Sequence, residues 1–217
     1  MAKTDWHEWH AKYDDPAGSL SKRLGTVRTE LTRILDARGS HPTQLVSICA
    51  GDGRDVLPVL AAGRGHVSAV LVELDGDLAG TARREAAGLG LHGIDVRTAD
   101  AGALDSYLEV PRADVFLACG VFGNITHEDL ETTIATLPQL LAPHASVIWT
   151  RGAERTEDPS ASTGDPVDLV REVFAQQDFV EDTVIRPHDA GFRVGVHRFV
   201  GAPTTPRHGG HMFRFIR

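Results

Sequence analysis

The stretch LVSICAGDGRD, residues 45–55, decides the fold. Its first six residues form a short, mostly apolar run, the turn Gly51-Asp52-Gly53 follows, and residues 54–62 continue with helical character. Glycines at such a turn let the backbone come close to a ligand and start the next helix. A strand, a glycine turn and a helix are common in isolation, so the rest of the chain must show which α/β fold they belong to.

Strands and helices alternate outward from this unit. We expect strands at 66–74, 94–100, 113–120 and 146–150, with helices at 75–90, 127–141 and 165–177 and a short helix or turn at 103–108. Such alternation predicts a mostly parallel sheet with helices on both faces. Two further strands, 179–187 and 192–200, are joined by a loop too short for a crossover, so the last strand of this seven-stranded sheet should be antiparallel. Residues 211–217 could add a last short strand.

The N-terminal part reads as helical. Residues 5–13 and 18–38 are expected to form two helices, with an amphipathic face in the second. We therefore divide the chain into an N-terminal helical cap or lid, residues 1–42, and a main α/β domain, residues 43–217.

Composition narrows the classes of function. The 217 residues fit one α/β domain, and the net charge of −8 argues against nucleic acid as the main partner. We find no apolar run that could span a membrane and no signal peptide, and the two cysteines fit a reducing cytoplasm. The eleven histidines lack the ligand clusters of a metal site, so no metal is predicted. A homodimer stays open.

Candidate binding residues follow the strands, because open α/β sheets bind ligands at the carboxyl ends of their strands. Glu73 comes about 20 residues after the glycine turn, the spacing at which an acid accepts hydrogen bonds from a ribose diol. Asp100 follows the third strand and could accept a hydrogen bond from an adenine amino group. For each acid the alternative is a helix cap, and Asp75 is the better cap for the helix that begins after it.

The order of these features resembles the class I S-adenosylmethionine-dependent methyltransferases over about residues 43–200. ICAGDGRD looks like the glycine-rich first motif, LVELDGDLAGTAR like the second, VRTADA like the third, and ACGVFGNI stands where the family has its substrate-side motif. The resemblance implies a three-layer Rossmann-like sandwich and S-adenosyl-L-methionine as cofactor, with S-adenosyl-L-homocysteine as product. The cofactor-binding residues it implies are Ala50, Gly51, Gly53, Glu73, Leu74, Asp100, Ala101, Cys119 and Gly120. The chain departs from the family at Ser47 and Cys49, where an acid and a glycine are usual.

The catalytic residues are harder to read, because the sulfonium of this cofactor is already an electrophile and the protein needs only to position the acceptor and sometimes to take a proton. Our candidates are His10 as a base, Tyr13 at the methionine end of the cofactor, and Asn124 on the substrate side. Arg151 could hold a substrate carboxylate, or it could be a solvated loop residue. We expect a small-molecule acceptor, methylated on oxygen or nitrogen.

Two other functions stay open. An NAD(P)-dependent oxidoreductase would also use a glycine turn and an acid after the second strand, but its G-x-G-x-x-G motif would need glycine where Val56 stands. A non-catalytic protein that binds an adenosyl cofactor would share every residue of the cofactor site. An RNA methyltransferase is disfavoured by the acidic charge.

Overall fold

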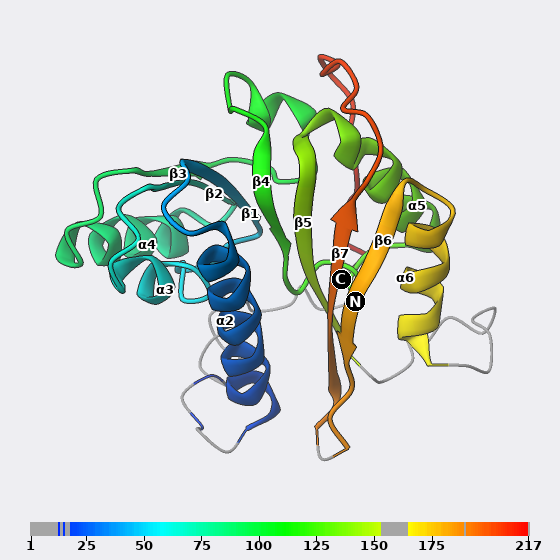
Figure 1. Ribbon diagram of the computed structural model, residues 1–217, viewed down its shortest axis with the longest axis horizontal. Coiled ribbons are helices and arrows are strands. Elements are labelled where there is room, and N and C mark those ends of the chain that lie inside the picture. The colour runs from blue at the N-terminus through cyan, green and yellow to red at the C-terminus, as the bar shows by residue number, and fades with distance from the viewer. Residues whose placement is uncertain (1–12, 14, 16–17, 153–164, 189, 217) are drawn as a thin grey trace.

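A computed structural model describes residues 13, 15, 18–152, 165–188 and 190–216 (Figure 1). A seven-stranded sheet runs through the molecule in the order β3-β2-β1-β4-β5-β7-β6. The strands β1 to β5 pair in parallel, and β7 is antiparallel to both of its neighbours, β5 and β6. The sheet confirms the prediction of a mostly parallel arrangement with a reversed last strand. The strand bounds are β1 Thr43–Ile48, β2 Val67–Glu73, β3 Ile94–Thr98, β4 Ala113–Ala118, β5 Leu141–Gly152, β6 Phe179–Ile185 and β7 Phe192–Phe199.

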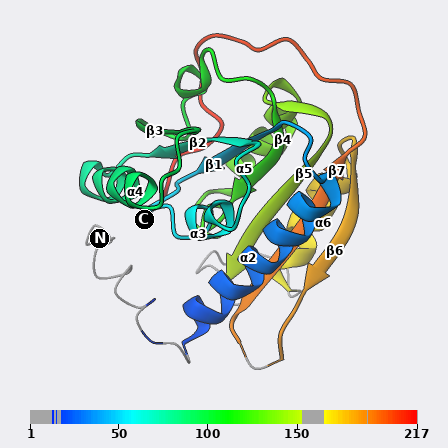
Figure 2. The same cartoon turned by 60° about the vertical axis from the view of Figure 1, so that its left-hand side comes forward.

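Helices cover both faces of the sheet, as Figures 1 and 2 show. The helices α2, α3 and α4 pack on one face, and α5 and α6 pack on the other. Asp75, Thr126 and Asp165 cap α4, α5 and α6 by accepting hydrogen bonds from backbone N–H groups of the first turn. The helix bounds are α2 Ser19–Arg38, α3 Leu57–Ala61, α4 Gly76–Gly88, α5 His127–Thr136 and α6 Pro166–Ala175, and the described ranges also hold the 3₁₀ turns η2 Leu104–Tyr107 and η3 Leu137–Gln139.

The core consists of two apolar layers, one on each side of the sheet. The layer under α2, α3 and α4 includes Leu31, Leu45 and Leu71, and the layer under α5 and α6 includes Phe116 and Trp149. Because the central strands are buried on both faces, their sequences read as continuous apolar runs. The amphipathic helix expected near residues 18–38 is α2, which contributes its apolar side to the first layer.

Some expected boundaries were wrong. The helix expected at 127–141 ends at Thr136, and β5 begins at Leu141, five residues before its expected start. The helix expected at 54–62 shortens to α3, because residues 51–56 form turns. Residues 211–216 form no strand beyond a single bridge from His211 to Ala103, since this segment crosses the loop after β3 instead of joining the sheet.

Two expectations cannot be compared with the fold. The first expected helix, 5–13, lies outside the described residues except for Tyr13, and the division of the chain at residue 42 stays a prediction. No helix in the described ranges is long and apolar enough to cross a membrane.

Candidate functional site

The site lies where the order of the strands reverses. From β1 the chain goes to β2 on one side, and β4 lies on the other side, so the loops after β1 and β4 diverge and leave a crevice at the strand ends. The loop after β1 has positive φ angles at Cys49, Gly51 and Gly53, of 51°, 57° and 78°. A side chain at Gly53 would also meet Leu57, because its Cβ would lie 2.7 Å from Leu57 Cδ1. The positive φ angles and the close approach of Leu57 therefore explain why glycines stand in this turn.

Glu73 joins the ends of β1 and β2. Its side chain is buried, with the residue 9% exposed, and Oε2 accepts a hydrogen bond from the Gly51 N–H at 2.7 Å. Oε1 accepts a hydrogen bond from the Asp75 N–H at 2.9 Å. A carboxylate oxygen has more than one acceptor direction, so both oxygens can still bind a ligand hydroxyl. The carboxylate is thus held in one orientation at the edge of the crevice.

Of the residues beside Glu73, Asp75 has the capping role that was expected of it. Asp75 is the helix cap, with Oδ1 accepting from the N–H groups of Asp77 and Leu78. Leu74 is 70% exposed and offers an apolar surface beside the acid. Ala50 is fixed between the two strands, since its N–H donates to Val72 and its carbonyl accepts from Gly53.

Asp100, which follows β3, does not cap the 3₁₀ turn η2, whose N-cap is Ala103, but its side chain does hold its own loop. Its Oδ1 accepts a hydrogen bond from the Gly102 N–H at 2.8 Å, and Oδ2 lies 3.4 Å from Nε2 of His211. Half of the side chain is exposed, so a ligand could still reach it. Ala101 is buried, and its carbonyl accepts a hydrogen bond from the Tyr107 hydroxyl. The role of Asp100 with adenine stays a prediction.

Cys49, directly after β1, lies close enough to both acids for their charges to act on its thiol. Burial raises the pKa of its thiol strongly, and the nearby carboxylates of Glu73 and Asp100 raise it further. The thiol is therefore neutral at physiological pH and is a poor nucleophile.

The loop after β4 forms the opposite side of the crevice. Burial also raises the pKa of the Cys119 thiol, which is hydrogen-bonded to Asp55 and Thr150. The Gly120 N–H donates to Thr150 Oγ1 at 2.8 Å. The side chain of Asn124 donates from Nδ2 to the Gly120 carbonyl at 2.7 Å, so it closes this loop upon itself. The structure thus gives Asn124 a structural contact, and its proposed catalytic role stays a prediction.

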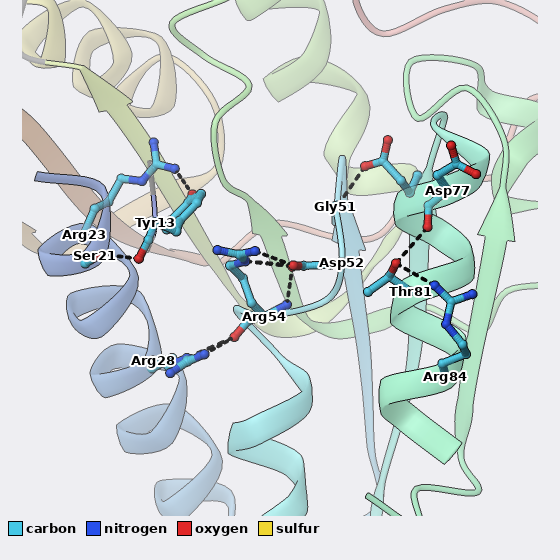
Figure 3. A network of polar contacts seen from close by, with 11 residues as sticks. Tyr13, Ser21, Arg23, Arg28, Gly51, Asp52, Arg54, Asp77, Thr81 and Arg84 are labelled. Atoms are coloured by element: carbon cyan, nitrogen blue, oxygen red, sulfur yellow. Dashed lines mark hydrogen bonds and ion pairs between the residues drawn. The ribbon is translucent and has the colours of Figure 1, made fainter. Parts of the chain in front are cut away.

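Tyr13 packs on the loop after β1, as Figure 3 shows. The guanidinium of Arg54 lies 4.5 Å from the centre of the Tyr13 ring, and Arg23 donates a hydrogen bond to the Tyr13 hydroxyl. Burial raises the pKa of Tyr13 to about 12, so the hydroxyl is protonated at neutral pH. The N-terminal segment therefore does reach the strand ends at this residue, while His10 lies outside the described residues.

Sequence reasoning missed two features of the site. The first is Asp55, whose carboxyl contacts Cys119 and lies near Arg23 and Arg28 of α2. Burial raises its pKa, while the two arginines lower it. An acid at the end of a glycine turn was the available signal, but α2 and β4 bring its neighbours from distant parts of the sequence.

The second missed feature is the C-terminal segment, residues 209–216. The Met212 N–H donates to the Gly102 carbonyl at 2.7 Å, and the Ile216 N–H donates to the Asn124 carbonyl at 3.0 Å. This segment therefore links the loop after β3 to the loop after β4 along one side of the crevice. Its apolar residues Met212 and Phe213 had suggested a strand, but they fill the layer under α5.

Metal chemistry finds no support in the described ranges, which contain no group of three or more His, Cys, Asp or Glu residues placed to hold an ion. Two cavities lie away from the strand ends. One, of about 570 Å³, opens between α6 and β6, and the other, of about 200 Å³, lies beside η2 and the loop at residues 108–112. The crevice at the strand ends is defined by its hydrogen bonds and by the strand order.

Solved structures with the same architecture cover most of the chain. Magnesium protoporphyrin IX methyltransferase from Synechocystis PCC 6803, with bound S-adenosylmethionine, has a TM-score of 0.68 at 14% identity, over 91% of this chain and 92% of that one. Ribosomal protein L11 methylase from Lactobacillus delbrueckii subsp. bulgaricus has a TM-score of 0.57 at 14% identity, over 82% and 80%. An RNA methyltransferase from Salinibacter ruber, in complex with S-adenosyl-L-homocysteine, has a TM-score of 0.50 at 17% identity, over 81% and 94%.

These neighbours differ in the substrates that their names give, so the fold does not select an acceptor. The expectation against nucleic acid therefore rests on the acidic charge alone. No protein-family model matches the chain, and no curated protein matches it in sequence. Strand order, the reversed β7 and the structural neighbours agree: the chain has the Rossmann-like fold of the class I S-adenosylmethionine-dependent methyltransferases.

Proposed function

We propose that the protein binds S-adenosyl-L-methionine at the ends of β1, β2, β3 and β4 and transfers its methyl group to a small molecule. The observation that carries the proposal is the fixed carboxylate of Glu73. Two backbone N–H groups orient it, one from the glycine turn and one from the start of α4. A preorganised acid beside a glycine turn suits a ribose diol, because both hydroxyls can donate to one carboxylate.

Other residues of the crevice fit the rest of an adenosyl cofactor. The exposed side chain of Leu74 offers an apolar contact for a purine ring, and Asp100 keeps exposed carboxylate surface near it. On the other side, Asp55 and Tyr13 face the loop after β4, where the amino acid end would lie. When bound, the cofactor would supply an electrophilic methyl group, and the residues of the chain would bind, orient and exclude water.

Methyl transfer from this cofactor requires no nucleophile from the protein and at most one group that takes a proton. Neither thiol at the crevice is ionised, so a covalent step through cysteine has no support. Asp55 lies beside the loop after β4, where its carboxyl contacts Cys119, so it is a candidate proton acceptor on the acceptor side. The small-molecule acceptor is supported by the net charge of −8, which disfavours polyanionic substrates.

Calorimetry tests the cofactor site. The protein should bind S-adenosyl-L-methionine and S-adenosyl-L-homocysteine, and Glu73→Ala should weaken both by about 1–3 kcal/mol, the scale of a lost hydrogen bond to a charged group. Asp77→Ala is the matched control, because Asp77 is an exposed acid in the first turn of α4 and its loss should leave binding unchanged. Folding of each variant is checked by circular dichroism.

Two outcomes would change the assignment. Binding of NAD⁺ with no binding of either adenosyl ligand would favour the oxidoreductase instead. Tight binding of S-adenosyl-L-methionine with no formation of S-adenosyl-L-homocysteine across a broad acceptor panel would favour the non-catalytic cofactor-binding protein. The buried Val56 in the last glycine position of a dinucleotide motif disfavours the first of these.

A further inference from the structure

We propose that Arg151 binds an acidic group, a carboxylate or a phosphate, on the methyl acceptor, so that the acceptor is an anionic small molecule. The statement that the anion is the methyl acceptor rests on the proposed function, whereas anion binding at Arg151 can be tested independently of that function. Arg151 lies in β5, one residue before the strand ends, on the same edge of the sheet as the glycine turn.

The first argument is an uncompensated charge. Asp165, the acid whose charge acts on Arg151, and Asp168, one turn further along α6, are already engaged by other arginines. Arg193, directly opposite on β7, donates from Nε to Asp165 at 3.0 Å. Arg186 donates to Asp168 at 2.6 Å. Among the residues that the structure describes, the guanidinium of Arg151 makes no hydrogen bond and no ion pair.

The second argument is burial. Arg207 and Arg214 also lack side-chain partners in the described structure, but both are exposed, so water solvates their charge. Arg151 is half-buried, and burial lowers the pKa of its guanidinium although Asp165 opposes this shift. A partly desolvated charge without a partner costs free energy, and a bound anion would offset that cost. Arg151 is thus the one half-buried guanidinium of the described residues that lacks a partner.

The third argument is position. A Cβ added to Gly123 would lie 3.9 Å from Arg151 Cγ, so the stem of Arg151 runs beside the loop that follows β4. The residue before it, Thr150, accepts the hydrogen bond from the Gly120 N–H of the same loop. Arg151 therefore lies beside the loop after β4, on the side of the crevice opposite to Glu73 and Asp100. A planar guanidinium can bind both oxygens of a carboxylate or phosphate there.

The test measures anion binding in the presence of S-adenosyl-L-homocysteine. The probes are benzoate, inorganic phosphate and, as the neutral match to benzoate, benzamide. Proton–nitrogen spectra follow the Arg151 Nε–H signal, which is assigned by its loss in Arg151→Gln. We expect a saturable shift with benzoate or phosphate and none with benzamide. Because Arg151→Gln lacks this signal, calorimetry with the same probes compares its affinity with that of the unchanged protein, and we expect binding weakened about tenfold or more, as for a lost bidentate charged contact. The stronger of the two anions tells which acidic group the site prefers.

Arg214→Gln is the control, because it removes an unpaired but exposed guanidinium and should leave anion binding unchanged. The affinity for S-adenosyl-L-homocysteine should stay within about twofold in both variants, since neither residue belongs to the proposed cofactor site. Equal anion binding by Arg151→Gln and the unchanged protein, or no saturable shift with either anion at millimolar concentration, overturns the inference. Anion binding at Arg151 by a protein that takes up no adenosyl ligand would instead overturn the proposed function and leave the anion site standing.

Discussion

The two halves of the sheet are held together in different ways. In the half formed by β1, β2 and β3, hydrogen bonds from backbone N–H groups to the carboxylates of Glu73 and Asp100 fix the groups at the strand ends. In the half formed by β5, β6 and β7, a buried aromatic cluster joins the strands to α6. Phe174 stacks on His197 at 4.2 Å, and Trp149 Nε1 donates to His197 Nδ1 at 3.0 Å.

This difference explains which side of the site can be read from the sequence. The glycine turn and the acid at the end of β2 stand at fixed places in one strand-turn-helix-strand sequence, so they leave a motif even though the hydrogen bond between Gly51 and Glu73 joins residues 22 positions apart. Aromatic packing joins β5, α6 and β7, whose residues are far apart, and it needs only apolar side chains of fitting shape. The cofactor side is therefore visible as a pattern, and the acceptor side is not.

The largest expected effect comes from placing a methyl group in the aromatic cluster. In Gly195→Ala, the new Cβ would lie 2.2 Å from two ring carbons of Trp149, a fully buried side chain that cannot move aside. We expect the free energy of unfolding to fall by about 3 kcal/mol, at the upper end for an overpacked core. Urea unfolding measures it.

The same exchange at Gly25 is the control. Gly25 is inside α2, where an added Cβ would meet nothing within 4 Å. Gly25→Ala should stabilise the protein by about 0.5–1 kcal/mol, because alanine is the better helix former. If the two variants unfold alike, the aromatic cluster is looser than the contacts imply.

A pH effect of intermediate size should come from His197. Burial lowers its pKa from 6.5 to about 4, so between these values the unfolded chain binds a proton that the folded protein does not. The free energy of unfolding should therefore fall as the pH drops from about 6.5 to 4, by up to about 3 kcal/mol from this residue. Protonation of Nδ1 would also remove the hydrogen bond from Trp149.

Urea unfolding at several pH values, compared between the unchanged protein and His197→Gln, isolates this contribution. Glutamine does not titrate, and its side-chain oxygen can still accept from Trp149. The variant should lose less stability over the same pH interval. Parallel curves for the two proteins would mean that His197 titrates normally in the folded state.

The smallest expected effect is in the half with β3. In Gly102→Ala, the new Cβ would lie 2.2 Å from the backbone oxygen of Phe213, so the C-terminal segment must shift. We expect a loss of about 1–2 kcal/mol, since a peripheral segment can relax where a core ring cannot. Hydrogen exchange of the Met212 amide, which donates to the Gly102 carbonyl, should become faster.

Gly88→Ala, at the end of α4 with open space around the added atom, should leave that amide unchanged. An equally protected Met212 amide in Gly102→Ala would show that the segment adapts without leaving the loop. If the shift also weakens binding of S-adenosyl-L-homocysteine, the segment borders the proposed cofactor site.

Several expectations about the site depended on contacts between distant parts of the chain, which a local sequence motif does not show. Glu73 and Asp75 were correctly separated into strand-end acid and helix cap, because the cap position is fixed by local backbone geometry. Asn124 was expected on the substrate side as a catalytic group, yet its amide closes the loop after β4. Asp55 passed unnoticed, since its surroundings come from α2 and β4. An acid or an amide looks the same in sequence whether it contacts its own loop or faces a ligand.

The sequence by itself determined the alternation of strands and helices, the reversed β7, the glycine turn and the acid at the end of β2. These features follow from periodicity, backbone conformation and loop length, which act over a few neighbouring residues. Only the tertiary structure decided the path of residues 209–216, the pairing that leaves Arg151 without a partner, and the surroundings of Asp55. These three features depend on which groups from distant parts of the sequence lie close enough to bind one another, and only the folded chain fixes those distances.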